Sequence, residues 1–355
     1  MGDSPRELPA GDTRVADGTA TSLARKIPRS LVEIGLPVLV IAVIVLLLPL
    51  FIPSFVSSLV SKMMIYGLFG MSLNIIWGYA GIPSFGHAAF FGVGGYAAGI
   101  LFLKVGISNF WLILLLAIVA AAVVAAILGF PAFRVFGVGA GAVNPIYFLL
   151  ATIAFGEILS RVAIAVRPVT GGSTGLSGIK KLDLAGFGFR MTSGRYYYLV
   201  FFIVVVCLFV MYRVVNSHYG YALRGIHDNE RRMQALGYNT WLYKYTSWII
   251  AGVFGSVAGV LFAFFGSTMI PNNLAMVTSD IAFLLVIMGS TTTFFGPLVA
   301  SVVYVGVEYL ASLYLPDRWP LIFGAMFVFT IMVIPQGLGV FILKWWRRLF
   351  SGSPA

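Results

Sequence analysis

Long apolar runs are the feature that most limits what this sequence can fold into. Residues 36–53 read LPVLVIAVIVLLLPLFIP and residues 111–130 read WLILLLAIVAAAVVAAILGF, with no charged residue in either run. About 20 helical residues, rising about 1.5 Å each, cross a hydrocarbon core of roughly 30 Å. Since 60% of the 355 residues are hydrophobic, a soluble fold could not cover this surface. The sequence therefore predicts a polytopic membrane protein.

The apolar segments predict an all-α fold with about ten transmembrane or re-entrant helices. Two segments, 86–104 and 278–290, are rich in Gly, Ser or Thr. Each of these two is predicted as a weak span or as a broken, re-entrant helix that lines a cavity. The predicted spans are 31–52, 59–77, 86–104, 110–130, 143–165, 196–213, 243–266, 278–290, 298–314 and 320–343.

Charge distribution predicts the orientation and the domain limits. Residues 1–30 are polar and mixed in charge, as in a disordered tail. The transmembrane domain is predicted at 31–343 and a short C-terminal tail at 344–355. Basic residues concentrate beside both ends and in segment 216–242. The positive-inside rule then places both termini and this segment in the cytoplasm.

Several function classes are excluded by residue content. The net charge of +11 comes from basic residues beside apolar runs, which indicates contact with lipid headgroups rather than with nucleic acid. The single cysteine, Cys207, cannot form an intramolecular disulfide. The sequence contains no phosphate-binding P-loop motif and no metal-ligand spacing. We therefore expect no enzyme activity, no metal and no cofactor in this chain.

A charged stretch, ALRGIHDNERRMQALGYN, occupies residues 222–239. Asp228 is suited to begin a helix as N-cap, and Gly237 is suited to end it. Met233 and Leu236 are three residues apart and are predicted to share one face. Such an amphipathic helix favours docking into a groove on a soluble partner. The alternative is a solvated loop whose arginines only set the topology.

Segment 78–100 is unusually rich in glycine for a bilayer. Pro83 and its glycines would break a helix and free backbone groups that must face protein or a polar cavity. Two interpretations remain open for Gly92 and Gly94: they form a wall of the translocation path, or they only allow close helix packing. His87 has no acidic or thiol neighbour in sequence, so we expect a packed, hydrogen-bonded side chain.

Charges and hydroxyls at membrane depth give further candidates. Glu157 and Arg161 are spaced to pair on one helix face, and Glu308 is a second buried carboxylate candidate. Residues 290–293 form a hydroxyl cluster that would line a polar path or cap a re-entrant turn. The candidate substrate-path residues are Glu157, Gly92, Gly94, Ser290, Thr291, Thr292 and Glu308.

Five sequence blocks carry a family resemblance. In order, they are GYAGIPSFGHAAFFGVGGYAAGIL, ATIAFGEILSRV, TGGSTGLSGI, ALRGIHDNERRMQALGYNTWLYK and GPLVASVVYVGVEYL. Taken together, these blocks resemble the branched-chain amino-acid type of ABC-importer permease, the LivM-like family, and the resemblance covers residues 60–340.

The resemblance implies a set of partners. These are a second, related permease that forms a heterodimer, two cytoplasmic ATPases that bind ATP and Mg, and an extracytoplasmic substrate-binding protein. Segment 216–242 would be the coupling segment that receives the ATPase movement. Its implied ATPase contacts are Arg224, Asp228, Asn229, Glu230, Ala235, Leu236 and Gly237. The chain departs from the family at Arg232 and Met233, where Ala-Ala is usual, and at GSTTTFFGP, where a Gly-rich turn is common.

The resulting hypothesis is a multi-pass permease subunit in the cell membrane of a prokaryote. It would import branched-chain or similar hydrophobic amino acids by alternating access. Two alternatives remain: a permease of the same family for urea or short amides, and an ion-coupled secondary transporter. The second alternative would use an intramembrane acid such as Glu157 or Glu308.

Overall fold

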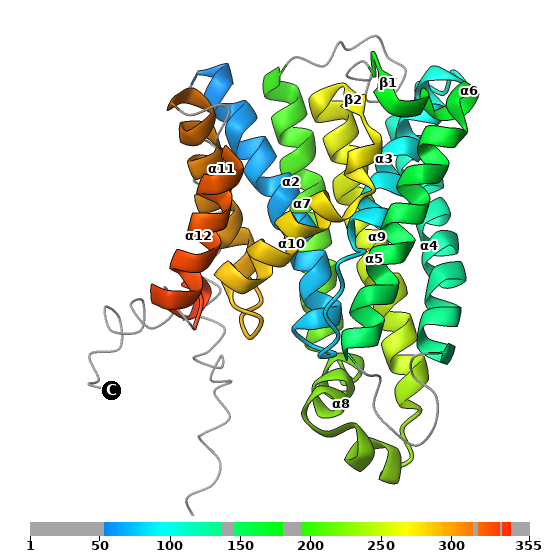
Figure 1. Ribbon diagram of the computed structural model, residues 1–355, viewed down its shortest axis with the longest axis vertical. Helices are drawn as coiled ribbons and strands as arrows, with labels where there is room; N and C mark the ends of the chain where they lie inside the picture. The colour runs from blue at the N-terminus through cyan, green and yellow to red at the C-terminus, as the bar shows by residue number, and fades with distance from the viewer. Residues whose placement is uncertain (1–52, 136–144, 180–192, 315–318, 334–335, 342–355) are drawn as a thin grey trace, which may run out of the picture. The chain divides into compact units, whose positions relative to one another are not determined.

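The computed structural model describes residues 53–135, 145–179, 193–314, 319–333 and 336–341 (Figure 1). The described helices belong to one compact unit, residues 52–355. The predicted first span at 31–52 and both predicted tails lie outside the described residues.

The described chain is almost entirely helical, which confirms the all-α prediction. Among the described residues, seven helices are long and apolar enough to cross a membrane. Six of these seven are α2 (Ser54–Trp77), α4 (Phe110–Val135), α5 (Pro145–Ala165), α7 (Ser193–Val215), α9 (Thr240–Gly266) and α11 (Gly296–Tyr314), and the seventh is the stretch Pro271–Gly289. Helix α8 (His218–Ala235) is not among the candidate spans. The shorter elements are α3 (Ala88–Leu103), α6 (Arg167–Thr170), η1 (Gly172–Thr174), η2 (Pro271–Asn273), α10 (Met276–Gly289), α12 (Trp319–Val333) and the strands β1 (Leu176–Ser177) and β2 (Thr268–Met269).

The core lies around α9, which packs against α2, α3 and α4. Glycines allow the helix backbones to approach closely: a Cβ on Gly94 would collide with the Ser256 carbonyl, and one on Gly259 with the Phe91 carbonyl. Trp248 fills the adjoining space and meets Phe90 edge-on at 4.9 Å between ring centroids. Close approach of small residues is how membrane helices gain packing energy, because lipid offers no hydrophobic drive between them.

Two central helices are short. Helix α3 has 16 residues and extends about 24 Å, less than the roughly 30 Å hydrocarbon core. Helix α10 itself has 14 residues, but with η2 before it the apolar stretch Pro271–Gly289 has 19 residues and is long enough to cross. Each follows an irregular stretch, residues 78–87 before α3 and 270–275 before α10. Figure 1 shows α10 running obliquely in front of α2. Each Gly- and Ser-rich segment thus contains a short α-helix that follows a break in the α-helical structure, and a re-entrant course stays a prediction.

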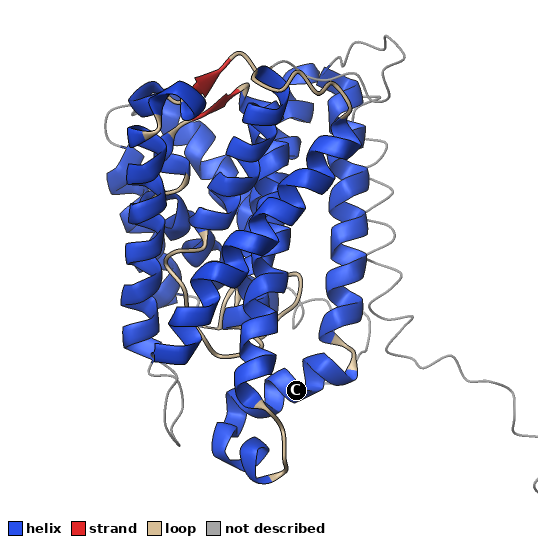
Figure 2. Ribbon diagram, turned by 90° about the vertical axis from the view of Figure 1, so that its right-hand side faces the viewer, coloured by secondary structure: helices blue, strands red, loops and turns tan. Residues whose placement is uncertain are grey.

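The two ends of this unit differ. Strands β1 and β2 pair antiparallel, with Leu176 opposite Met269, and lie at one end, whereas α8 lies at the other (Figure 1 and Figure 2). Gly175 sits in the left-handed region at φ 71° and touches the Met269 backbone. A side chain there would collide with the Met269 carbonyl, so this glycine permits the pairing.

Candidate functional site

Helix α8 is longer than predicted and is bent. It begins at His218, after Ser217, and its backbone leaves the helical region at Asn229, with φ −159° and ψ 96°. The Asn229 Oδ1 accepts a hydrogen bond from the Arg232 N–H at 3.0 Å. Asn229, and not Asp228, is therefore the N-cap of the second half of α8. The prediction of Asp228 was wrong because both side chains can cap and only the backbone bend distinguishes them.

The predicted C-terminal glycine is confirmed. Gly237 has φ 87°, its N–H bonds the Gln234 carbonyl at 2.9 Å, and the Tyr238 N–H bonds the Met233 carbonyl at 3.1 Å. These two bonds form a Schellman motif, which needs a residue in the left-handed region and favours glycine.

The predicted common face of Met233 and Leu236 does not exist. Met233 lies against Gly225, where a Cβ would stand 2.8 Å from the Met233 sulfur. Leu236 points outward and is 67% exposed. The bend at Asn229 folds the second half of α8 onto the first, so the Met233 side chain packs against the first half of the same helix.

A buried ion pair fastens α8 to α9. The Lys244 Nζ lies 2.6 Å from the Glu230 Oε2, and the two side chains are only 5% and 10% exposed. The Gln234 amide also donates to the Thr240 hydroxyl at 3.0 Å. Glu230 thus faces the bundle and not the solvent. Sequence reasoning missed Lys244, although a lysine in the first turns of an apolar span signals a partner.

The irregular stretch 78–87 touches α8 at two points. The Arg224 guanidinium lies 5.1 Å from the Tyr79 ring centroid, within the range of a cation–π contact. Burial raises the pKa of Tyr79, although Arg224 acts in the opposite direction. Gly81, at φ 74°, holds the His227 ring so closely that a Cβ would collide with it. The irregular stretch is therefore in direct contact with α8 at both of these points.

The coupling residues named from the sequence divide into two groups. Arg224 and Glu230 are turned toward neighbouring residues. The other five are exposed: Asp228, Asn229, Ala235, Leu236 and Gly237. Three more exposed apolar side chains belong to this region: Tyr221, Tyr238 and Leu242.

The glycines named for the substrate path sit in tight contacts. A Cβ on Gly92 would collide with the Leu274 side chain, just before α10. Gly94 faces the Ser256 backbone of α9. Close packing accounts for both positions, and their place in a translocation path stays a prediction.

Glu157 binds the start of a broken helix. Its Oε1 accepts a hydrogen bond from the Met276 N–H at 3.2 Å, at the N-terminus of α10. A carboxylate is stabilised there by the helix dipole. Within the described part of the chain no ion pair joins Glu157 to Arg161, so the pairing suggested by their spacing does not form.

The hydroxyl cluster forms the turn between α10 and α11. Ser290 has φ 86°, and its Oγ lies 2.9 Å from the Thr292 Oγ1. The Thr293 hydroxyl donates to the Gly289 carbonyl at 3.1 Å, while the Thr291 carbonyl touches Gly78 of the irregular stretch. These bonds satisfy the groups that the turn exposes.

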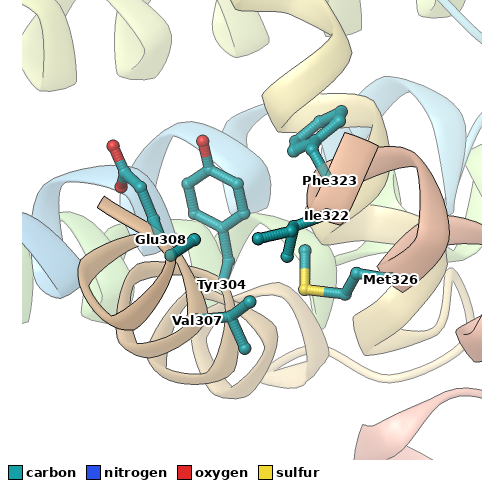
Figure 3. A pocket seen from close by; sticks show the side chains of 7 residues that line it. Tyr304, Val307, Glu308, Ile322, Phe323 and Met326 are labelled. Atoms are coloured by element: carbon teal, nitrogen blue, oxygen red, sulfur yellow. The ribbon is translucent and has the colours of Figure 1, made fainter. Parts of the chain in front are cut away.

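Glu308 pairs with Lys62 of α2 at 2.8 Å, and both side chains are 25% exposed. Figure 3 shows Glu308 and Tyr304 side by side on α11, facing α12 residues that include Phe323 and Met326. The shallow pocket between them is lined mainly by apolar side chains. Lys62 was not among the predicted residues because it lies 246 positions away in sequence.

His87 is fully buried, and its Nε2 lies 2.7 Å from the Ser72 Oγ. This confirms the expected packed, hydrogen-bonded histidine. No group of three or more His, Cys, Asp or Glu that could hold a metal occurs in the part of the chain that the structure describes.

Seven helices among the described residues that are long and apolar enough to cross a membrane indicate an integral membrane protein. Comparison with known proteins makes this specific. The chain belongs to the family of branched-chain amino acid transport system permease components, whose family model matches residues 55–332. This confirms the resemblance found in the sequence blocks, and the family is a transport component, not an enzyme.

Individual relatives carry related names. The chain is 27% identical over 297 residues to the high-affinity branched-chain amino acid transport system permease protein LivM of Escherichia coli, covering 78% of this chain and 68% of that protein. It is 27% identical over 284 residues to a probable LivM of Methanocaldococcus jannaschii, covering 70% and 79%. A probable LivH of the same archaeon is 24% identical over 306 residues, covering 81% and 92%. No solved structure matches significantly.

Proposed function

We propose that this chain is a membrane subunit of an ATP-driven importer for branched-chain or similar hydrophobic amino acids. It would pair with a second, related permease and with two cytoplasmic ATPases that bind ATP and Mg. A binding protein outside the membrane would deliver the substrate. The names of the relatives, LivM and LivH, support the substrate class and a related permease partner.

The observation that carries the proposal is the geometry of α8. Its second half is held to α9 by the buried Glu230–Lys244 pair, yet Leu236 beside it is 67% exposed. A rigidly mounted helix with an exposed apolar residue suits docking into a groove on a soluble partner. A loop that only set the topology would need no buried ion pair. Burying each charge costs on the order of several kcal/mol, and this cost is offset only when the charges pair.

The orientation follows from the same segment. The ATPases are soluble cytoplasmic proteins under the proposal, so the end of the bundle that carries α8 would face the cytoplasm. The charge distribution of the sequence predicts a cytoplasmic position for both termini as well. The end with β1 and β2 then faces the delivered substrate. Alternating access would open these two ends in turn, and the 78–87 stretch would relay α8 movement to the core through its contacts with Arg224 and His227.

Leu236→Glu tests the docking role in the assembled transporter. We expect the ATPases to be lost from the purified complex and ATP-dependent leucine uptake to fall, because a charge replaces the exposed apolar contact. Ile270→Glu is the matched control, since Ile270 is also exposed, at 42%, beside η2 at the opposite end of the bundle. This control should retain its ATPases.

Two results would overturn the proposal. Full ATPase retention and uptake in Leu236→Glu would mean that α8 is not the docking element. Uptake by the wild-type permease pair without ATP or ATPases would instead identify an ion-coupled secondary transporter.

A further inference from the structure

Among the described residues, one carboxylate in a membrane helix has no partner. The structure describes five carboxylates: Glu157, Asp228, Glu230, Asp280 and Glu308. Four of them are bonded, to the Met276 N–H, His227, Lys244 and Lys62 respectively. Within the described chain, Asp280 of α10 makes no hydrogen bond and no ion pair. The sequence predictions did not include Asp280, although a single acid inside an apolar segment is a signal that could have identified it.

Asp280 lies on a partly exposed stripe of α10. Met276, Asp280, Phe283 and Ile287 follow the i, i+4, i+7, i+11 spacing of one helix face, and all four are partly exposed. Leu285, on the opposite side of α10, is fully buried. A charge at membrane depth is costly against lipid and faces water, a cavity or a partner. Asp280 itself therefore faces water, a cavity or a group of another subunit.

An aromatic stack stands next to Asp280 on this stripe. Phe283, less than one turn further along α10, is stacked between Trp77 of α2 and Phe85 of the irregular stretch. Both centroid distances are 4.1 Å, and both interplanar angles are 21°. The stack places partly exposed aromatic side chains within one helical turn of the carboxylate. An unpaired anion close to aromatic side chains complements a ligand with a cationic group and a hydrocarbon group.

We propose that Asp280 binds the ammonium group of the transported amino acid, and that the Trp77–Phe283–Phe85 stack contacts its hydrocarbon side chain. The inference rests on the proposed function and adds the position of the substrate. It also discriminates among substrates: urea and short amides carry no cation for Asp280, and a carboxylic acid without an amine is repelled by it.

The first test is leucine uptake by the complete complex in proteoliposomes, with ATPases and binding protein present. Asp280→Asn should reduce uptake about 10- to 100-fold, the range expected when a hydrogen bond to a charged group is lost. Asp280→Glu should restore part of the rate, because it keeps the charge. Both variants should retain the second permease and the ATPases.

The second test asks whether position 280 meets water and substrate. Cys207 is the single cysteine of the chain, so a Cys207→Ser background leaves only an introduced thiol. In the complex, Asp280→Cys should react with a cationic methanethiosulfonate, because the position meets the water that the substrate must also reach. Val302→Cys, on α11 and 52% exposed, is the control and should stay unlabelled against lipid.

The outcomes separate this inference from the proposed function. Loss of the second permease from Asp280→Asn would show that Asp280 pairs with a cation of that subunit and would overturn the inference. Unchanged leucine uptake in Asp280→Asn, or no labelling of Asp280→Cys, would also overturn it. Failure of the wild-type complex to import leucine with ATP would count against the proposed function itself.

Discussion

Lys244→Met removes one member of the buried pair that holds α8 to α9. The two charged atoms are 2.6 Å apart, and the Glu230 side chain is only 10% exposed. The substitution therefore leaves a carboxylate buried without a counter-charge. Removing one partner of such a pair costs about 3–5 kcal/mol. At about 1.4 kcal/mol per tenfold change, the open form of the second half of α8 should become at least about 100-fold more populated.

Trypsin reports this opening directly, because the exposed residues Arg231 and Arg232 follow Glu230. Cleavage of a folded segment tracks the population of its open form when opening and closing are fast. The detergent-solubilised Lys244→Met variant should be cut at these arginines about 100-fold faster than wild type. Cleavage of the denatured chains supplies the intrinsic rate for each sequence.

The Asp228→Asn variant is the matched control. The Asp228–His227 pair is 3.4 Å long, and its Asp228 side chain is 79% exposed. Exposed pairs contribute about 0–1 kcal/mol, so cleavage should change by less than about fivefold. A cleavage rate in Lys244→Met within fivefold of wild type would refute the view that this pair fastens α8.

Three further predictions follow from local contacts. Asn229→Ala should raise the same tryptic rate about fivefold, because loss of an N-cap costs about 1 kcal/mol. Gly259→Ala should lower the thermal unfolding temperature of the purified chain, because its Cβ would collide with the α3 backbone. Gly306→Ala is the control and should leave this temperature unchanged, because Gly306 faces open space. Equal unfolding temperatures of the two variants would contradict the close packing at Gly259. Lys62→Met should destabilise the chain more than the double variant Lys62→Met/Glu308→Gln, since only the single change leaves an unpaired carboxylate. If the double variant lost as much thermal stability as the two single variants added together, Lys62 and Glu308 would not be energetically coupled.

Helix positions were predictable because span length and apolar runs are properties of local sequence. The predicted span 243–266 corresponds to α9 at Thr240–Gly266, and 298–314 corresponds to α11 at Gly296–Tyr314. The same local rules gave Gly237 as the residue that ends α8. Turn chemistry of this kind is set by one or two neighbouring residues.

Pairing across the fold was not predictable from one sequence. Lys62 and Glu308 are 246 positions apart, and the residues around either one do not indicate that the other is its partner. Glu230 was expected to face a partner protein, but its direction depends on Lys244 in the next helix. Asp228 and Asn229 are both good N-caps, so the bend in α8 had to be seen before the cap could be assigned.

The irregular stretch 78–87 contacts α8 at Tyr79 and Gly81 and the aromatic stack at Phe85. One short, non-helical segment thus contacts both proposed sites. Under both proposals, thermodynamic reciprocity applies: if ATPase binding at α8 changes the affinity for an amino acid at Asp280 by some factor, the amino acid changes ATPase affinity by the same factor. An empty transporter and a loaded one would then hold their ATPases with different strength.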